Sequence, residues 1–286
     1  IRIEGNDKTK DFVIRRVLMV APGMRISVDD PRFEVSRIRV LSLGYFSDVR
    51  LTLQKGSERG RVVLVVEVVE RGTIVLTSIF LGTSEATTAW GGLGAAENNL
   101  LGRGISLEGA FVLGSDPEVE RGDLQQSYLL RLGMRQVGGL NMAVGASFRY
   151  VEGSEFFRRA GPESSSDPAD FLSIRYRRIG GTLGFGFGIG RFLRLYVDYR
   201  GEAITSDHPA GAVRRDPAGS GEPIDFGIRD GDSILSAVHV QLELDTRSDP
   251  VLPHSGKLLQ LEGVASSGFI GSTYDYFKLT ARYEHF

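Results

Sequence analysis

The residues most able to do chemistry are four histidines and a few serines, and their spacing argues against a catalytic or metal site. The histidines are His208, His239, His254 and His285. No two of them lie four residues apart, so no helical pair of zinc ligands is present, and the chain has no cysteine. The segment GTSEA at residues 82–86 lacks the second glycine of a nucleophile elbow. We therefore expect no enzyme, no metal and no cofactor.

Glycine and arginine clusters are the next candidates, because both residue types bind phosphate. The stretch LGFGFGIG at residues 183–190 has neither the lysine nor the following helix of a phosphate loop. Glycines in a bent or closely approached strand are predicted there instead. The arginine pairs at 158–159, 177–178 and 214–215 are predicted to lie in solvated loops or on a polar sheet face. Contact with lipopolysaccharide or with a charged plug in a pore is the alternative.

A polar hairpin carries the remaining candidates. In LELDTRSDPVLPHSGKLLQLEG, residues 242–263, two alternating arms flank a turn that contains Pro253 and Gly256. Asp245 and Arg247 end the first arm at a spacing of two residues. One interpretation is a turn-stabilising pair, in which Asp245 caps backbone N–H groups and Arg247 reaches across a pore. The other is a network inside that pore which holds an inward-folded loop.

Composition excludes several classes of protein. Of the 286 residues, 41% are hydrophobic and 24% charged, so the chain is not disordered, and the net charge of −2 gives no reason to expect nucleic-acid binding. No run of 18 apolar residues exists, which excludes a transmembrane helix but not membrane strands, because their alternation averages out. The first residues, IRIEGNDKT, are not a signal peptide, so any leader is expected to lie outside this stretch.

Residues 1–71 are predicted to form a separate β-α-α-β-β domain. A helical stretch is expected near residues 9–20, and a second helix begins where Asp30 can cap it and Pro31 fits its first position. Gly44 fits the position just beyond its end. The predicted buried side chains of this second helix are Phe33, Val35, Ile38 and Leu41.

Residues 72–286 contain about ten strand-like segments, several of which alternate, with apolar residues at every second position and polar residues between them. They lie near 74–81, 87–95, 104–114, 124–136, 140–151, 171–188, 192–204, 233–247, 255–266 and 274–286. Segments of about ten residues, joined by some short and some long polar connections, match tilted membrane strands. The side chains predicted to face outward to lipid are Leu130, Leu132, Leu195, Val197, Leu242 and Leu244. A soluble sandwich with these residues in its core is the alternative.

Three segments in this order resemble the BamA/TamA-type outer-membrane insertase superfamily. The β-α-α-β-β stretch resembles a POTRA domain, with Gly-Tyr-Phe between its second helix and the following strand. ENNLLGRGISLEG, residues 97–109, resembles an early turn of the family's barrel, and DTRSDPVLPHSGKLLQLE resembles its mid-barrel hairpin. The family's sixteen strands, several POTRA domains and Val-Arg-Gly-Phe/Tyr loop are not all present. A fragment with an α+β POTRA domain and an incomplete antiparallel transmembrane barrel is expected.

The resemblance implies an outer-membrane assembly factor with its POTRA domain in the periplasm of a Gram-negative bacterium. Its implied partners are unfolded outer-membrane protein clients, the lipid bilayer, lipopolysaccharide and accessory assembly lipoproteins. A client strand would add to the first barrel strand, which is one side of a weak seam. A two-partner secretion or TamA-like pore that exports a polypeptide is the alternative. The implied seam residues are Ile74, Val75, Leu76, Thr77, Ser78, Ile79, Phe80 and Leu81.

Overall fold

The structure is a computed structural model that describes residues 1–84, 87–115, 124–137, 141–161, 167–190, 192–215, 221–248 and 253–286. Its α-helices and strands are β1 (Arg2–Glu4), α1 (Asp11–Arg15), α2 (Arg32–Leu41), β2 (Phe46–Lys55), β3 (Val62–Glu70), β4 (Ile74–Ser84), β5 (Thr87–Leu100), β6 (Ile105–Ser115), β7 (Leu124–Met134), β8 (Met142–Arg158), β9 (Phe171–Ile189), β10 (Leu193–Asp207), β11 (Val213–Arg215), β12 (Gly221–Pro223), β13 (Gly231–Asp245), β14 (Lys257–Ser266) and β15 (Tyr276–His285). Two short 3₁₀ helices, Pro168–Asp170 and Gly268–Ile270, lie in connections.

The first unit is a three-stranded sheet in the order β1-β3-β2, with two helices packed against it. Strand β3 is apolar on both parities because it is the central strand, and Val65 and Val66 are fully buried. Helix α1 contributes Val13 and Ile14 to the same core. The unit therefore has its own hydrophobic core.

The helices of this unit differ from the sequence-based prediction in extent and in face. Helix α1 has five residues and does not extend to Val20, because the Met19 N–H donates to Ser36 Oγ of α2 at 2.9 Å instead of continuing the helix. In α2 the prediction of a buried Val35 and Ile38 is wrong, because the buried side follows Ser36 and Val40. Phe33 and Leu41 pack at the margin of the core, as predicted.

The start of α2 is held by Asp30. Its carboxylate accepts the backbone N–H of Arg32 at 3.0 Å and pairs with the Arg32 side chain at 2.6 Å. Pro31, the residue just before the helix, already has helical angles and makes no side-chain cap bond, so the capping group lies one residue earlier. Gly44 has φ +80° and lies beyond the helix end, two residues after the C-cap Ser42.

Replacing Asp30 by alanine is expected to lower the melting temperature of the α/β unit by about 5 °C, since the Arg32 N–H loses its acceptor. Hydrogen bonds from Arg32 lower the pKa of Asp30 to about 2. A lowered pKa stabilises the folded state above the ordinary carboxyl range, and that stabilisation is lost as the pH falls toward 2. The difference between wild type and Asp30→Ala, measured by thermal unfolding, should therefore vanish near pH 2. An equal difference at pH 2 and pH 7 would contradict this cap.

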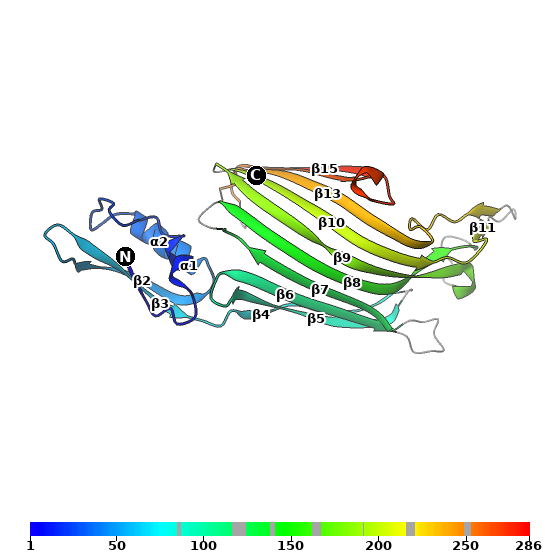
Figure 1. Ribbon diagram of the computed structural model, residues 1–286, viewed down its shortest axis with the longest axis horizontal. Helices are drawn as coiled ribbons and strands as arrows, with labels where there is room; N and C mark the ends of the chain where they lie inside the picture. Colours follow the sequence, from blue (N-terminus) through cyan, green and yellow to red (C-terminus); the bar gives the residue numbers. More distant parts are fainter. Residues whose placement is uncertain are drawn as a thin grey trace.

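The second unit is a ten-stranded antiparallel sheet in the order β15-β14-β13-β10-β9-β8-β7-β6-β5-β4. It contains the ten predicted strands, and the long connection after β10 adds a small β11–β12 hairpin that the sequence did not predict. The α/β unit lies at one end of this curved sheet, which we call the proximal end, and β11 lies at the opposite, distal end (Figure 1).

Strand register divides this sheet into two faces. One row of paired residues runs across β7, β8, β9 and β10 and consists of Leu132, Ala146, Leu183 and Tyr199. The neighbouring row contains Arg131, Ser147, Thr182 and Arg200. We call these the apolar face and the polar face. Of the six residues predicted to face outward, Leu130, Leu132, Leu242 and Leu244 are well exposed, whereas Leu195 and Val197 are partly covered by neighbours on the same face.

The apolar face has the height of a membrane band. Along β9 its apolar positions run from Ile179 to Ile189, ten residue steps, or roughly 33 Å along the strand. A strand tilt of about 40° reduces this to about 25 Å, the height typical of barrel membrane bands. At the distal limit Tyr128 and Tyr150 face each other with ring centroids 6.2 Å apart, as in an interfacial aromatic girdle. Beyond them the same face turns polar, at Gln126, Glu152 and Arg177.

Among the described residues, no helix has both the length and the hydropathy needed to cross a bilayer.

Candidate functional site

Strand β4 forms one edge of the ten-stranded sheet. Its only strand partner among the described residues is β5, so its second row of backbone groups has no partner strand there. Its side chains Ile74, Leu76, Ile79 and Leu81 lie on the apolar face and are 61–78% exposed. The predicted seam residues thus form a free, largely apolar edge. Their role in pairing with a client remains a prediction.

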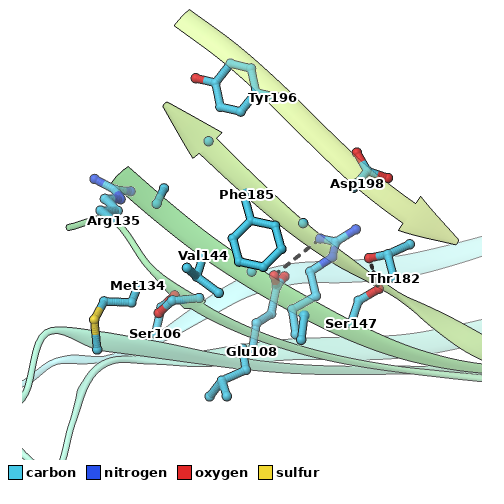
Figure 2. Close-up of a pocket in the computed structure, with 18 of the residues that line it drawn as sticks. Ser106, Glu108, Met134, Arg135, Val144, Ser147, Thr182, Phe185, Tyr196 and Asp198 are labelled. Carbon is cyan, nitrogen blue, oxygen red and sulfur yellow. Dashed lines mark hydrogen bonds and ion pairs between the residues drawn. The ribbon is translucent and has the colours of Figure 1, made fainter. Parts of the chain in front are cut away.

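The polar face is hollowed next to β7–β10. The hollow has a volume of about 690 Å³, and Glu108, Ser147, Thr182, Tyr196 and Asp198 line it (Figure 2). Its floor is low because Gly133, Gly145 and Gly184 lie in register on three neighbouring strands. The strand glycines predicted from LGFGFGIG have this role, since a side chain at Gly186 would meet the Tyr196 ring at 3.0 Å.

Ion pairs between strands stabilise the polar face. Glu202 is 5% exposed and accepts from both Arg178 and Arg200 at 2.6 Å. Farther along, Asp198 contacts His239 Nδ1 at 2.5 Å. Removing both arginines would leave the buried Glu202 carboxylate without a counter-charge, so these ion pairs stabilise a polar interior wall. Arg178, one of the predicted basic patches, lies on this face.

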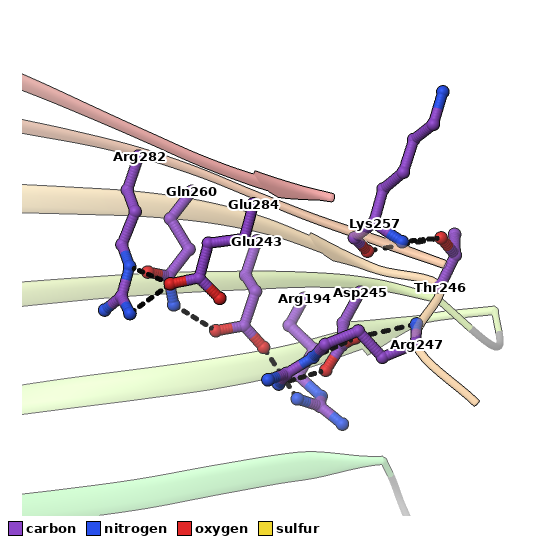
Figure 3. Close-up of polar contacts among 9 residues, drawn as sticks. All are labelled: Arg194, Glu243, Asp245, Thr246, Arg247, Lys257, Gln260, Arg282 and Glu284. Carbon is purple, nitrogen blue, oxygen red and sulfur yellow. Dashed lines mark hydrogen bonds and ion pairs between the residues drawn. The ribbon is translucent and has the colours of Figure 1, made fainter. Parts of the chain in front are cut away.

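The predicted polar hairpin lies at the proximal end. The Asp245 carboxylate accepts the Arg247 backbone N–H at 3.1 Å and both its Nε and Nη2 at 2.9 Å (Figure 3). The predicted cap is therefore present, and the Arg247 side chain pairs with Asp245; a reach of Arg247 across the pore remains a prediction. A bidentate pair two residues apart forms within the turn and needs no partner across the sheet. Its neighbours Glu243 and Arg194 pair at 2.6 Å.

Gly256 is required by this hairpin and Pro253 lies on its return arm. Gly256 has φ +109°, and a side chain there would come within 2.3 Å of the Thr246 carbonyl oxygen. Thr246 and Lys257 close the hairpin through a backbone bond of 2.9 Å. Part of the turn, residues 249–252, lies outside the described residues.

The turn between β5 and β6 docks against the α/β unit. The Lys10 N–H donates to the Gly102 carbonyl at 2.8 Å, and Asn99 Nδ2 donates to Thr9 Oγ1 at 2.8 Å. The side-chain oxygen Oδ1 of Asn99 accepts the Gly104 N–H at 2.7 Å, so the same side chain also holds the turn. Thr9 and Asn99 are 2% and 7% exposed. We call this group of contacts the junction.

Two further residues hold the junction. Glu70, at the end of β3, accepts the backbone N–H groups of Lys8 and Thr9 at 2.9 and 2.6 Å. Although burial acts to raise the pKa of Glu70, these bonds keep it below its ordinary value. Arg16 donates to the Gln136 carbonyl at 3.0 Å, and burial lowers its pKa. Backbone groups of both units are therefore satisfied by each other.

The sequence pointed to only one side of this junction. The motif ENNLLGRG was singled out for its resemblance, and it contains Asn99 and Gly102. Thr9, Arg16 and Glu70 were missed, because single polar residues in a small α/β unit have no distinctive spacing. The described residues contain no group of three or more His, Asp or Glu side chains able to hold a metal ion.

Comparisons with known proteins agree with this architecture. Residues 1–71 match the POTRA family described as a surface antigen variable number repeat. The outer membrane protein assembly factor BamA of Neorickettsia risticii is 25% identical over 201 residues, covering 70% of this chain and 24% of that protein. The crystal structure of Haemophilus ducreyi BamA lacking POTRA domains 1–3 superposes with a TM-score of 0.69 at 15% identity, covering 99% of this chain and 50% of that one.

CdiB from Escherichia coli has the same fold, with a TM-score of 0.56 at 12% identity, over 97% of this chain and 47% of that one. The chain thus spans about a quarter to a half of the proteins that it matches. Its POTRA domain and incomplete antiparallel barrel are those predicted from the sequence. Residues 99–286 match the Omp85 superfamily domain, and the chain belongs to that superfamily.

Proposed function

We propose that this chain is part of an assembly factor that inserts β-barrel proteins into the outer membrane of a Gram-negative bacterium, with its POTRA domain in the periplasm. The observation that carries the proposal is the place of β4, the first strand after the POTRA domain, at one edge of the sheet, where its exposed side chains continue the apolar face. A closed barrel needs a further strand to pair with this edge, so β4 would be one side of its seam. Unpaired backbone groups at such an edge are costly in lipid and favour addition of a further strand.

The mechanism we infer is mechanical and uses no enzyme chemistry. Strand β2, ten residues long, is the longer of the two edge strands of the POTRA sheet and is the place where an extended client segment would first add. The junction sets where the POTRA domain lies relative to the proximal turns of the sheet. A client passed from β2 to β4 would then form its strands against the existing sheet, with lipid on the apolar face.

Export of a polypeptide through the pore is the second candidate. The hollow on the polar face and its charged lining, which includes the Arg131–Glu108 ion pair, favour it, because an aqueous path needs a polar wall. The two proposals differ in the part of the barrel that must move. Insertion needs the β4 edge to open, whereas export needs the polar interior to be free.

Cysteines on β4 and on the strand that closes the barrel against it test this distinction in the whole protein. A disulfide there is expected to stop insertion of other barrels, and reduction should restore it. The matched control is a disulfide between β7 and β8, at Leu130 and Phe148, which are already paired neighbours. Normal insertion with β4 locked would refute the edge mechanism. If plugging the pore then stopped export, the second candidate would be favoured.

A further inference from the structure

The pairing of β4 with β5 is interrupted twice. Leu76 lies opposite Ala95 and Ser78 lies opposite Gly94, so Thr77 is an extra residue with no partner in β5. A second shift falls between Gly82 and Ser84. Such bulges disrupt the ladder, bend the strand and increase its twist. Between the two shifts Ser78–Gly82 pair one to one with β5, as do Ile74–Leu76 before the first shift, and the extra residue of the second shift lies on β5. Ser78–Gly82 is therefore the longer of the two regular segments of β4.

The first bulge preserves the two faces. The β4 residues on the apolar face are 74, 76, 79 and 81, which is not a strict two-residue period. The extra residue Thr77 absorbs the mismatch, so all four side chains lie on the apolar face. Gly94 makes room for this, since a side chain there would lie 2.4 Å from Ser78 Oγ and 2.8 Å from Thr77 Oγ1.

The same bulge limits what the free edge can bind. A strand added to an edge needs a regular repeat of N–H and C=O groups along one straight segment. Those conditions hold over five residues from Ser78 to Gly82 but over only three from Ile74 to Leu76, because the strand bends at Thr77. Natural sheet edges use bulges in this way to prevent unspecific pairing.

We propose that β4 accepts an added strand over Ser78–Gly82, the longer of its two regular segments, and that the bulge at Thr77 fixes the register of that strand. The proposal rests on the proposed function, because it takes β4 as the edge that pairs with clients. The partner that fits is a short amphipathic strand. Side chains opposite Ile79 and Leu81, which are 63% and 78% exposed, would be apolar and face lipid. The side chain opposite Phe80 would face the polar side.

Cysteine scanning of β4 in the whole protein tests this register. Single cysteines at each position from 74 to 82 are combined with a peptide of alternating valine and threonine that carries lysines at both ends and one central cysteine. Residues 1–286 contain no cysteine, so they form no disulfide with the peptide unless a cysteine is introduced. Disulfides are expected at positions 78–82 and several-fold weaker at 74–76.

Deletion of Thr77 is the decisive variant. Without this residue the remaining sequence alternates without interruption, so every side chain keeps its face while the bulge disappears. Disulfide formation should then extend to positions 74–76. Thr77→Ser is the matched control, because it keeps the bulge and should keep the window at 78–82. Migration of unheated protein on gels checks that each variant is folded.

The outcomes separate the two proposals. Equal disulfide yields at all positions from 74 to 82 in the otherwise unchanged protein would overturn the proposed pairing window at 78–82. Yields that stay confined to 78–82 after deletion of Thr77 would overturn it as well. In both cases pairing of a strand with the β4 edge would still be supported. Absence of disulfides at every β4 position, together with normal insertion when β4 is locked, would overturn the proposed function as well.

Discussion

An arginine in place of Val240 is expected to destabilise the folded sheet in a bilayer by about 2–4 kcal/mol, which is the cost of this charge near the middle of a lipid-facing band. Val240 lies on the apolar face of β13, is 41% exposed and faces Val197 and Gly263 on the neighbouring strands. It lies near the middle of the stretch from Ile234 to Leu244, the limits of the apolar residues on this strand. The guanidinium would therefore have no polar surface close by.

The adjacent residue supplies the control. Gln241 points to the polar face, where it lies opposite Tyr196 and Glu262. Gln241→Arg adds the same charge next to a carboxylate and should leave stability nearly unchanged. The measurement is urea unfolding of the whole protein refolded into lipid vesicles. Equal destabilisation by both substitutions, or by Gln241→Arg alone, would contradict the assignment of the apolar face to lipid.

Alternation was sufficient to predict this sheet. Each strand of the type seen in YLLRLGM repeats its apolar residues every second position, so the number of strands and the facing of Leu130 and Leu132 followed from the sequence. The facing of the side chains in paired strands is also fixed when one face of the sheet is apolar. A shift of one strand by one residue relative to its neighbour would turn its charged side chains toward lipid.

The sequence was least informative where a local pattern has two solutions. In IVLTSIFL, residues 74–81, either parity is apolar over part of its length, and only the pairing with β5 shows that Thr77 is bulged. Helix α2 has apolar residues on more than one side, so Val35 and Ile38 competed with Val40 for the core. In the hairpin, Arg247 had a closer partner two residues away than any across the sheet.

The junction could not have been predicted from spacing, because its partners Thr9 and Asn99 are 90 residues apart. What the sequence offered was a glycine-rich turn, and the structure gives the reason for that glycine. Gly102 has φ +70°, and a side chain there would lie 1.8 Å from the Lys8 carbonyl oxygen. The backbone of the α/β unit therefore occupies the space that any other residue would need.

Replacing Gly102 by valine is accordingly expected to undock the POTRA domain from the sheet. The left-handed backbone alone costs about 1–3 kcal/mol for a residue other than glycine, and the overlap with Lys8 adds to it. Amide hydrogen exchange should reveal the loss of docking at two N–H groups. That of Lys10 donates to Gly102 across the junction, and that of Gly104 donates to the Asn99 side chain within the turn. Both should exchange more than tenfold faster.

Gly109→Val is the matched control for this prediction. Gly109 lies on the apolar face of β6, and a side chain there would meet no atom within 4 Å. Valine suits both a strand and a lipid-facing position, so this variant should keep the slow exchange of Lys10. Unchanged exchange in Gly102→Val would show that the two units stay docked without this turn. Faster exchange in both variants would indicate a loss of fold in the sheet. Faster exchange in Gly102→Val alone would show that this turn fixes the POTRA domain, and with it the path from β2 to the β4 edge.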